Sequence, residues 1–353
     1  MKQLDEMKWE CFLLEELFGN DGIEHCKCSN VSKLKKGSFP YVGATTSNNG
    51  IIHYVEENTD LRTKGNCIAF ICDGDGSIGL SMYKEHDFIG STTVKVGRAK
   101  WLNRYTGMFF TSVADLGRSR YSFGYKRNDK NLKLEHIMLP VSAPHTPDYA
   151  YMEEYMRNKE KEMLTKYKKY LDKHSAEMNV DELCLDSRRW KEFFLEDIFF
   201  ISSSIRLTKD DMKKGKRPFV GASDSNNGVT AFVGNTNNSL DRNVLGVNYN
   251  GSVVENFYHP YEAIFSDDVK RLHLKEYKDD KYVFLFIKQS ILMQKCKYEY
   301  GYKFNGERMK RQKIMLPITS SSTPDYAFMA KYMKGMELKQ LKAYIDKRLN
   351  NMD

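Results

Sequence analysis

The sequence predicts an α/β protein of two tandem domains with mixed or antiparallel sheets, separated by a pair of long antiparallel helices. Two observations predict this fold class: the second half of the 353-residue chain repeats the first, and each half ends in a long helical pattern. At roughly 100–200 residues per domain, the chain has the length of two or three domains that each bury a core. Its 41% hydrophobic and 13% aromatic residues exclude a wholly disordered chain.

Three blocks of sequence occur twice in the same order. As first and second occurrence, they are residues 9–18 and 190–199, residues 36–51 and 214–229, and residues 137–152 and 314–329. In the middle pair, 10 of 16 positions are identical. A period near 178 residues is too long for a solenoid repeat, so it indicates a duplicated domain whose copies can pack as a pseudo-dimer. Between the blocks the similarity almost vanishes.

We expect the first domain over residues 1–145 and the second over residues 189–322. Mixed or alternating apolar patterns predict strands at residues 67–72, 91–96, 244–248 and 282–287. Turn-rich segments lie between the predicted strands, such as Ser-Asn-Asn-Gly at 47–50 and Asp-Gly-Asp-Gly-Ser at 73–77.

A long helix is expected after each domain, at about residues 147–174 and 324–349 within segments 146–175 and 323–353. Thr146 is a suitable N-cap, Pro147 suits the first helical position, and Asp148 favours the positive end of the helix dipole. About 27 residues at roughly 1.5 Å each give a rod of about 40 Å. Because each rod has one apolar stripe, we expect the two helices to pair as a coiled coil, the alternative being that each packs on its own domain. Residues 176–188 are the expected linker.

The sequence carries no recognisable catalytic or metal motif. Dinucleotide-binding, nucleophile-elbow and zinc-protease patterns are missing, and the 73–77 segment lacks the endings of a calcium or phosphate loop. The pair Cys26 and Cys28 has no second pair at zinc-finger spacing, and the odd number of seven cysteines favours reduced thiols. We therefore expect a chain that is not an enzyme and holds neither a metal nor a cofactor.

Basic and aromatic residues alternate in several segments, a pattern typical of nucleic-acid contact. The net charge of +8 favours an anionic partner, and such segments offer cations for phosphates, planar forks for guanine and rings for sugar or base. The candidates of the first domain are Asn48, Asn49, Arg98, Lys100, Arg104, Arg118, Arg120, Tyr125, Lys126 and Arg127. Those of the second domain are Asn226, Asn227, Tyr300, Tyr302, Lys303, Arg308, Lys310 and Arg311. A solvated basic face is the alternative for any one segment, and a hairpin turn explains the asparagines equally well.

The order of domain, helix, domain, helix resembles the specificity (S) subunit of type I restriction–modification systems, including the short S subunits of type IIB systems. The resemblance covers nearly the whole chain and includes Trp-x-x-Phe-x-Leu near the start of each domain and Gly-Tyr-Lys with Ile-Met-Leu-Pro near its end. It implies that each domain is a target recognition domain reading one half of a split double-stranded DNA sequence. It also implies that the helices act as spacer and docking surface for adenine methyltransferase subunits, which would supply S-adenosylmethionine, with a nuclease subunit or fused nuclease domain completing the complex. The docking stripe is expected at Met152, Tyr155, Met156, Met329, Tyr332 and Met333.

Two alternatives remain at this stage. One is an orphan specificity subunit that redirects a host methyltransferase, and the other is a tandem-domain protein adaptor that does not contact DNA. The N-terminal residues carry Asp5, Glu6 and Glu10 where a signal peptide needs an apolar run, so we expect a cytoplasmic protein.

Overall fold

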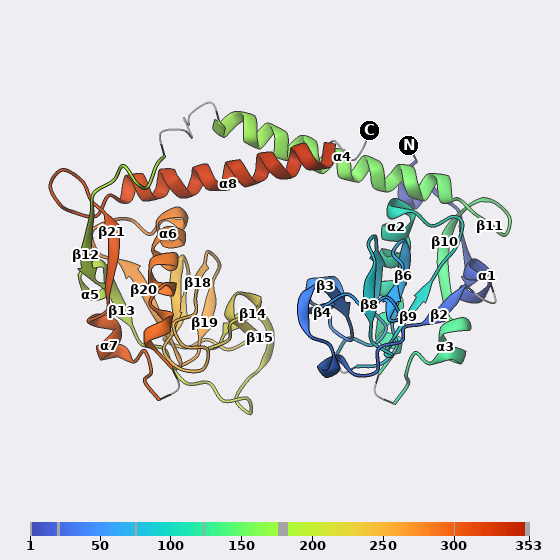
Figure 1. Cartoon of the computed structure of the whole chain (residues 1–353), viewed down its shortest axis with the longest axis horizontal. Coiled ribbons are helices and arrows are strands. Elements are labelled where there is room, and N and C mark those ends of the chain that lie inside the picture. Colours follow the sequence, from blue (N-terminus) through green and yellow to red (C-terminus); the bar gives the residue numbers. More distant parts are fainter. Residues whose placement is uncertain are drawn as a thin grey trace. The chain divides into compact units, whose positions relative to one another are not determined.

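The computed structural model describes residues 2–19, 22–74, 76–122, 124–175, 183–299 and 301–349. The chain divides into two compact units, Met1–Thr165 and Lys166–Asp353. Figure 1 shows sheets and short helices in each half of the chain, followed along the sequence by a long helix. In the described residues no helix is both long and apolar enough to cross a membrane.

Among its described residues, the first unit has three sheets, with strand orders β1-β10-β11, β2-β9-β6-β7 and β4-β3-β8-β5. Its strands are β1 (Trp9–Leu13), β2 (Ile23–His25), β3 (Lys36–Val42), β4 (Ile51–Val55), β5 (Arg62–Thr63), β6 (Cys67–Ile71), β7 (Ser81–Lys84), β8 (Phe88–Gly90), β9 (Val94–Gly97), β10 (His136–Ala143) and β11 (Thr146–Pro147). Its helices are α1 (Leu14–Phe18), α2 (Arg104–Ala114), α3 (Asp129–Lys133) and the start of α4 (Tyr149–Ser175).

The second unit repeats this architecture, with strand orders β12-β21, β13-β20-β17-β18 and β15-β14-β19-β16. Its strands are β12 (Trp190–Phe194), β13 (Phe199–Ser202), β14 (Lys214–Val220), β15 (Val229–Val233), β16 (Leu240–Asp241), β17 (Val244–Asn248), β18 (Asn256–His259), β19 (Ala263–Phe265), β20 (Val269–Leu274) and β21 (Lys313–Pro317). Its helices are α5 (Leu195–Ile198), α6 (Lys281–Leu292), α7 (Gly306–Lys310) and α8 (Tyr326–Leu349).

The expected fold class of two tandem α/β domains with mixed sheets and long helices is confirmed. In each unit one pair of strands is parallel, β3 with β8 and β14 with β19, whereas the other pairs named are antiparallel. The two four-stranded sheets keep the same order in both units even where the sequences have diverged. The central strands β6 and β17 are buried along their whole length, which explains their continuous apolar sequences.

One predicted strand is wrong. Residues 282–287 lie in α6, because the Asp280 side chain accepts hydrogen bonds from the amides of Tyr282 and Val283 and so caps a helix. A short run of apolar residues fits a buried helix as well as a strand, and periodicity does not distinguish them. The predicted strand at 91–96 begins later, at Val94, because a turn closed by the Val94 amide and the Ser91 carbonyl precedes it.

Each long helix begins two residues later than predicted, at Tyr149 and Tyr326. The Asp148 carboxylate accepts a hydrogen bond from the Tyr151 amide at 2.9 Å, and Asp325 does the same for Phe328 at 3.0 Å. Thr146 therefore is not the N-cap, because with Pro147 it forms the short strand β11 against β10. The aspartate, expected only to favour the dipole, is the capping residue itself.

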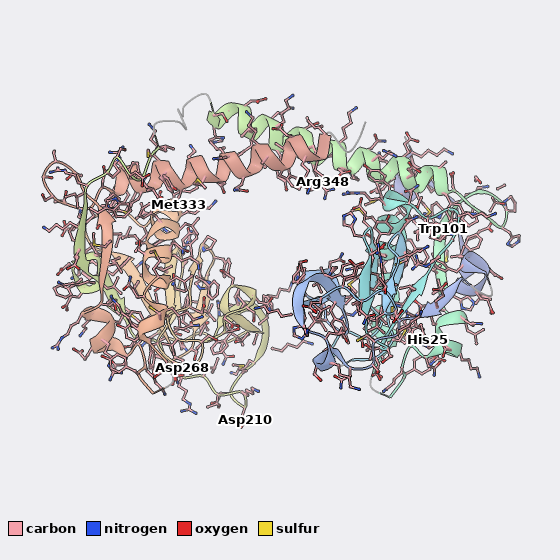
Figure 2. The ribbon with its side chains drawn as sticks, in the orientation of Figure 1. His25, Trp101, Asp210, Asp268, Met333 and Arg348 are labelled. Atoms are coloured by element: carbon pink, nitrogen blue, oxygen red, sulfur yellow. The ribbon has the colours of Figure 1, made fainter. Side chains whose placement is uncertain are left out.

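The first turns of each long helix pack on their own domain. Met152 is fully buried in the first core among Phe12, Leu139 and Phe110, and Met329 is fully buried in the second. At the start of α4, Tyr149 stacks on Trp101 with ring centroids 4.7 Å apart, and Figure 2 labels Trp101 below this helix. The first turns of both helices therefore follow the alternative expectation, in which each helix packs on its own domain. Pairing between the two helices stays a prediction. Residues 176–182 of the expected linker lie outside the described residues.

Candidate DNA interface

Both domains carry the same small hairpin, which ends in an exposed tyrosine. Ser122 pairs with Tyr125 through two backbone hydrogen bonds, and Glu299 pairs with Tyr302 in the same way. We call residues 121–125 and 298–302 the tyrosine hairpins. Residues 123 and 300 lie outside the described residues, so the candidate Tyr300 is not placed.

Each hairpin holds its exposed ring against an inner, anchored tyrosine. Tyr125 stacks on Tyr121 with centroids 6.0 Å apart, and Tyr302 stacks on Tyr298 at 5.8 Å, with an interplanar angle of 12° in both. The inner hydroxyls donate hydrogen bonds of 2.7 Å, from Tyr121 to Glu135 and from Tyr298 to Gln312. The outer rings remain 52% and 49% exposed. A ring that is exposed yet fixed in orientation is suited to packing on a base or sugar.

Three of the predicted cations of the first domain lie beside its hairpin. The Arg118 guanidinium donates to the carbonyl of Gly76, and Arg120 is exposed with its Nε donating to the Gly117 carbonyl at 3.1 Å. Lys126 is exposed and lies 2.6 Å from the Asp73 carboxylate, whose pKa it holds below its usual range. Exposed ion pairs of this kind are weak and exchange readily for a phosphate.

The prediction that Arg127 contacts DNA is corrected by the structure, because this residue is buried and has a structural role. Its side chain is 0% exposed and forms a two-pronged ion pair with Glu135, with Nε–Oε2 2.7 Å and Nη2–Oε1 2.9 Å. Its Nη1 donates to the carbonyls of Gly79 and Leu80 and to the hydroxyl of Ser81. A guanidinium so enclosed is unavailable to DNA. At the equivalent positions the second domain has Phe304 and Gln312.

In the second domain, one of the predicted cations lies directly against the outer tyrosine. The Arg308 guanidinium lies 3.8 Å from the centroid of the Tyr302 ring and donates to the Lys303 carbonyl at 2.8 Å. Lys303 is half-buried, Lys310 pairs with Glu307 at 2.9 Å, and Arg311 is exposed at the end of α7. The basic candidates of this domain therefore lie in the hairpin segment and the short helix that follows it.

Two other predicted arginines have structural roles, which is a second correction. Arg98 donates to the carbonyls of Gly65 at 2.8 Å and Lys64 at 2.7 Å, so it ties β9 to the loop before β6. Arg104 is 21% exposed and pairs with Glu160 of α4 at 3.2 Å, so it fastens α2 to the long helix. Lys100 is exposed, and its contact with DNA stays a prediction.

The four asparagines form turns with left-handed backbone. Asn48 and Asn49 have φ of 49° and 48°, and Asn226 and Asn227 have φ of 51° and 55°, a region that asparagine tolerates better than most residues. All four side chains are exposed, and the Asn227 amide donates to the Tyr258 carbonyl at 3.3 Å. The turn geometry explains why these residues are repeated, and a contact with adenine stays a prediction.

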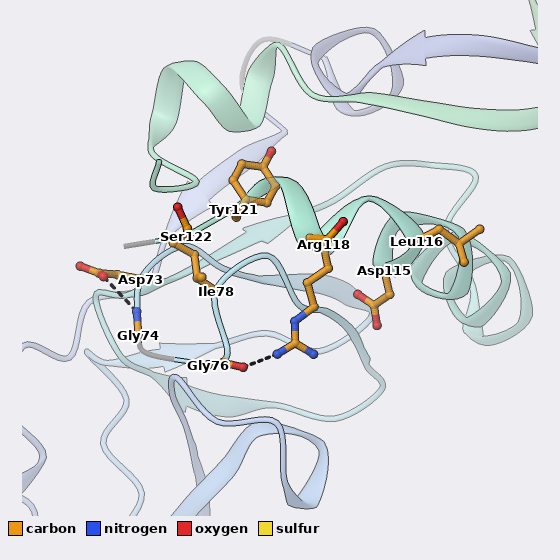
Figure 3. A pocket seen from close by; sticks show the side chains of 10 residues that line it. Asp73, Gly74, Gly76, Ile78, Asp115, Leu116, Arg118, Tyr121 and Ser122 are labelled. Carbon is orange, nitrogen blue, oxygen red and sulfur yellow. Dashed lines mark hydrogen bonds between the residues drawn. The ribbon is translucent and has the colours of Figure 1, made fainter. Parts of the chain in front are cut away.

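A cavity of about 670 Å³ lies next to the tyrosine hairpin of the first domain. Figure 3 shows Arg118 reaching across the cavity to Gly76. On the other side, the Asp73 carboxylate accepts a hydrogen bond from the Gly74 amide. The lining residues are Asp73, Gly74, Gly76, Ile78, Asp115, Leu116, Arg118, Ser119, Tyr121 and Ser122. An arginine beside carboxylates offers both a donor fork for guanine and acceptors for cytosine.

Arg118 is the one sequence candidate among the residues that line this cavity, and two of the residues that were missed are Asp115 and Leu116. Leu116 is 82% exposed at its edge, and burial raises the pKa of Asp115, which accepts a hydrogen bond from the Ser81 amide at 2.9 Å. No motif marks either residue, since they come together only because the 115–120 turn folds over the β6–β7 connection. The one available signal was the position of both within a stretch that differs between the two copies.

The expected docking stripe is partly wrong. Met152 and Met329 are fully buried in the cores of their own domains, so no partner reaches them. Tyr155, Met156, Tyr332 and Met333 are half-buried and pack against the same cores. The exposed apolar residues of α4 lie further along the helix, where Met163 is 53% exposed and Tyr167 is 38% exposed.

Comparison with known proteins identifies the family. A family model for the type I restriction modification DNA specificity domain matches residues 6–166 and again residues 187–345. The chain is 40% identical over 334 residues to the type II restriction enzyme BgcI specificity subunit S.BcgI of Heyndrickxia coagulans, covering 94% of this chain and 96% of that protein.

Solved structures of the same kind of subunit are more distant. The S subunit of a type I restriction–modification system from M. genitalium is 14% identical with a TM-score of 0.45, covering 98% of this chain and 94% of that one. The HsdS subunit from Thermoanaerobacter tengcongensis is 11% identical with a TM-score of 0.34, covering 96% and 91%.

Each family match runs through one domain and much of the long helix that follows it. The specificity subunit from Heyndrickxia coagulans also aligns over almost its whole length, so the similarity extends to the two-domain organisation. The chain therefore belongs to the type I restriction modification DNA specificity domain family, and it is a non-catalytic specificity subunit of a restriction–modification system.

Proposed function

We propose that the chain reads a bipartite DNA target, one half-site with each domain, and that its tyrosine hairpins make the central contacts. The observation that carries this proposal is the repetition of an exposed, stacked tyrosine in both domains. The surroundings differ: Arg118, Lys126 and a cavity accompany the first ring, and Arg308 accompanies the second. Equal rings in different polar surroundings suit two readers that recognise different bases.

The long helices set the distance between the two readers in this proposal. Helix α4 has 27 residues and α8 has 24. At about 1.5 Å per residue, they measure about 40 and 36 Å, close to one turn of duplex at about 34–36 Å. A spacing of this size would place the half-sites about one helical turn apart on the same side of the DNA.

The methyltransferase subunits dock, in this proposal, on the long helices beyond the turns that pack on the domains. The exposed Met163 and Tyr167 offer adaptable apolar surface there. The methyltransferase would use S-adenosylmethionine to modify adenine, and this chain would select the site. Because the relative from Heyndrickxia coagulans is the specificity subunit of a restriction enzyme, we include a nuclease in the proposed complex.

Co-expression tests the proposal. The chain is produced with candidate methyltransferase subunits, and methylated adenines are mapped across the host DNA. We expect methylation at a split sequence only when this chain is present. In parallel, affinity of the purified chain for duplex should fall with salt, since cations that contact phosphates release counterions. Unchanged methylation together with no binding to duplex DNA would contradict the proposal.

A further inference from the structure

Three neighbouring positions carry different charge in the two domains. In the first domain, Lys95 of β9 lies 2.5 Å from the Asp129 carboxylate, and the His25 ring lies 2.9 Å from the same carboxylate. Lys95 foremost, and then His25, hold the pKa of Asp129 below its usual range. Figure 2 labels His25 at the end of the domain away from the long helix. The ammonium of Lys95 is thus neutralised within the domain.

The sheet register identifies the equivalent lysine of the second domain. Lys95 pairs with Phe70 in the central strand β6, and Lys270 pairs with Val247 at the same place in β17. The strand on the other side of each lysine identifies the second position. In the first domain the residue that pairs with Val96 is followed by His25, and in the second domain the residue that pairs with Arg271, Ser202, is followed by Ser203. Ser203 therefore stands where the first domain has His25.

The cap of the short helix identifies the third position. Asn128 accepts a hydrogen bond from the amide three residues on and begins α3, and Asn305 does the same for α7. The residue after each cap is Asp129 in the first domain and Gly306 in the second. The second domain therefore has a lysine, a serine and a glycine where the first has a lysine, a histidine and an aspartate.

Lys270 has no carboxylate partner among the described residues. Its ammonium donates to the Ser203 hydroxyl at 2.9 Å and lies 4.9 Å from the centre of the Tyr249 ring. Burial lowers its pKa, and the positive charge of Lys310 lowers it further. Lys310 pairs with Glu307 on α7, and this hydrogen bond, together with the negative charge of Glu196, raises the pKa of Lys310. Lys270 thus lies beside a position that the first domain fills with a carboxylate, with Lys310 near enough to lower its pKa.

We infer that Lys270 and Lys310 bind a backbone phosphate of the DNA, at a position that Asp129 closes in the first domain. The inference rests on the proposed function and adds an asymmetry to it. A phosphate supplies the negative charge that Gly306 does not, and it relieves the repulsion between the two ammonium groups. Since Arg308 and Tyr302 lie on or beside the same short helix, the phosphate belongs to the nucleotides that this hairpin contacts.

The substitution Gly306→Asp tests the inference by giving the second domain the carboxylate of the first. A Cβ at Gly306 meets the Lys270 Cε at 3.9 Å, which is ordinary contact, so the new side chain fits. Aspartate is also favoured in the first turn of a helix. The control Gly306→Asn has nearly the same shape without the charge, and Lys270→Gln removes the cation instead.

The measurement is the affinity of the full chain for a fluorescein-labelled duplex across a salt series. We expect Gly306→Asp and Lys270→Gln each to reduce the slope of log affinity against log salt by about one, and Gly306→Asn to leave it unchanged. Thermal unfolding identifies any variant that does not fold, and Lys310→Gln then provides the same readout from a different element.

The outcomes separate the two levels of the proposal. If the unmodified chain binds duplex with a salt-dependent affinity but the charge variants keep its slope, the phosphate position is wrong and DNA recognition stands. If Gly306→Asn lowers the slope as much as Gly306→Asp, shape and not charge is responsible, and the inference is overturned. If the unmodified chain does not bind duplex at all, both this inference and the proposed function fail.

Discussion

The buried arginine of the first domain gives the sharpest test of the assignment of structural and DNA-contacting cations. Arg127→Ala removes both hydrogen bonds to Glu135 and three more to Gly79, Leu80 and Ser81. The Glu135 side chain is 4% exposed and would keep the hydrogen bond that it accepts from the Tyr121 hydroxyl. Removing one member of a buried ion pair costs about 3–5 kcal/mol, because the other charge is left buried.

A double substitution distinguishes the lost charge from the lost packing. Arg127→Phe with Glu135→Gln installs the pair that the second domain uses at these positions. We expect it to cost clearly less than Arg127→Ala, although the acceptors of Nη1 would still lose their donor. The surface variant Arg120→Ala is the matched control and should change stability by no more than about 0.5 kcal/mol.

The assay is hydrogen exchange followed by mass spectrometry, because a two-domain chain does not unfold in one two-state step. Peptides from β6 and β10 report on the first domain and peptides from β17 and β21 on the second. Arg127→Ala should accelerate exchange in the first set alone. If exchange is unchanged while DNA affinity falls as it does for a phosphate contact, Arg127 contacts DNA and the reasoning is refuted.

Three further predictions concern pH, the turns and docking. Hydrogen bonds to Asp279 and then Asp241 raise the pKa of His273 to about 9. The second domain should therefore lose stability as pH rises from about 7 through 9. His273→Gln should flatten this dependence when unfolding is measured over that pH range. Asn227→Gly should keep DNA affinity and Asn227→Ala should destabilise the second domain by about 1 kcal/mol, because the turn needs left-handed backbone; a loss of affinity with glycine would instead show that the amide reads a base. Met163→Glu should prevent co-purification with the methyltransferase while Lys161→Glu, on the same helix, should not, and equal recovery of both complexes would count against docking on this helix.

The repetition in the sequence predicted the fold well because it is a global property. Duplicated blocks at both ends of each domain imply two copies of one topology, whatever lies between them. The error at residues 282–287 arose because a short apolar run satisfies a strand and a buried helix equally, and only the cap at Asp280 decides. The cap at Asp148 was missed because Thr146 and Pro147 are taken into a strand that the local pattern does not reveal.

The candidate site was predictable as a region and not residue by residue. Alternating cations and aromatics marked the segments in which Tyr125 and Tyr302 are exposed, and their contact with DNA stays a prediction. Whether a given arginine faces solvent or the core depends on a distant carboxylate, as Glu135 shows for Arg127. Met152 failed as a docking residue for the same reason, because an apolar helical stripe does not say which surface covers it.

The claim that two domains read two half-sites is tested most directly by changing one hairpin at a time. Once the methylated sequence is mapped, affinities of the Tyr125→Ala and Tyr302→Ala chains are measured for duplexes altered in either half of the target. Each variant should become indifferent to alterations in one half only, a different half for each, while still discriminating bases in the other half. If both variants lose discrimination in the same half, or if neither loses any, the two-reader account is contradicted.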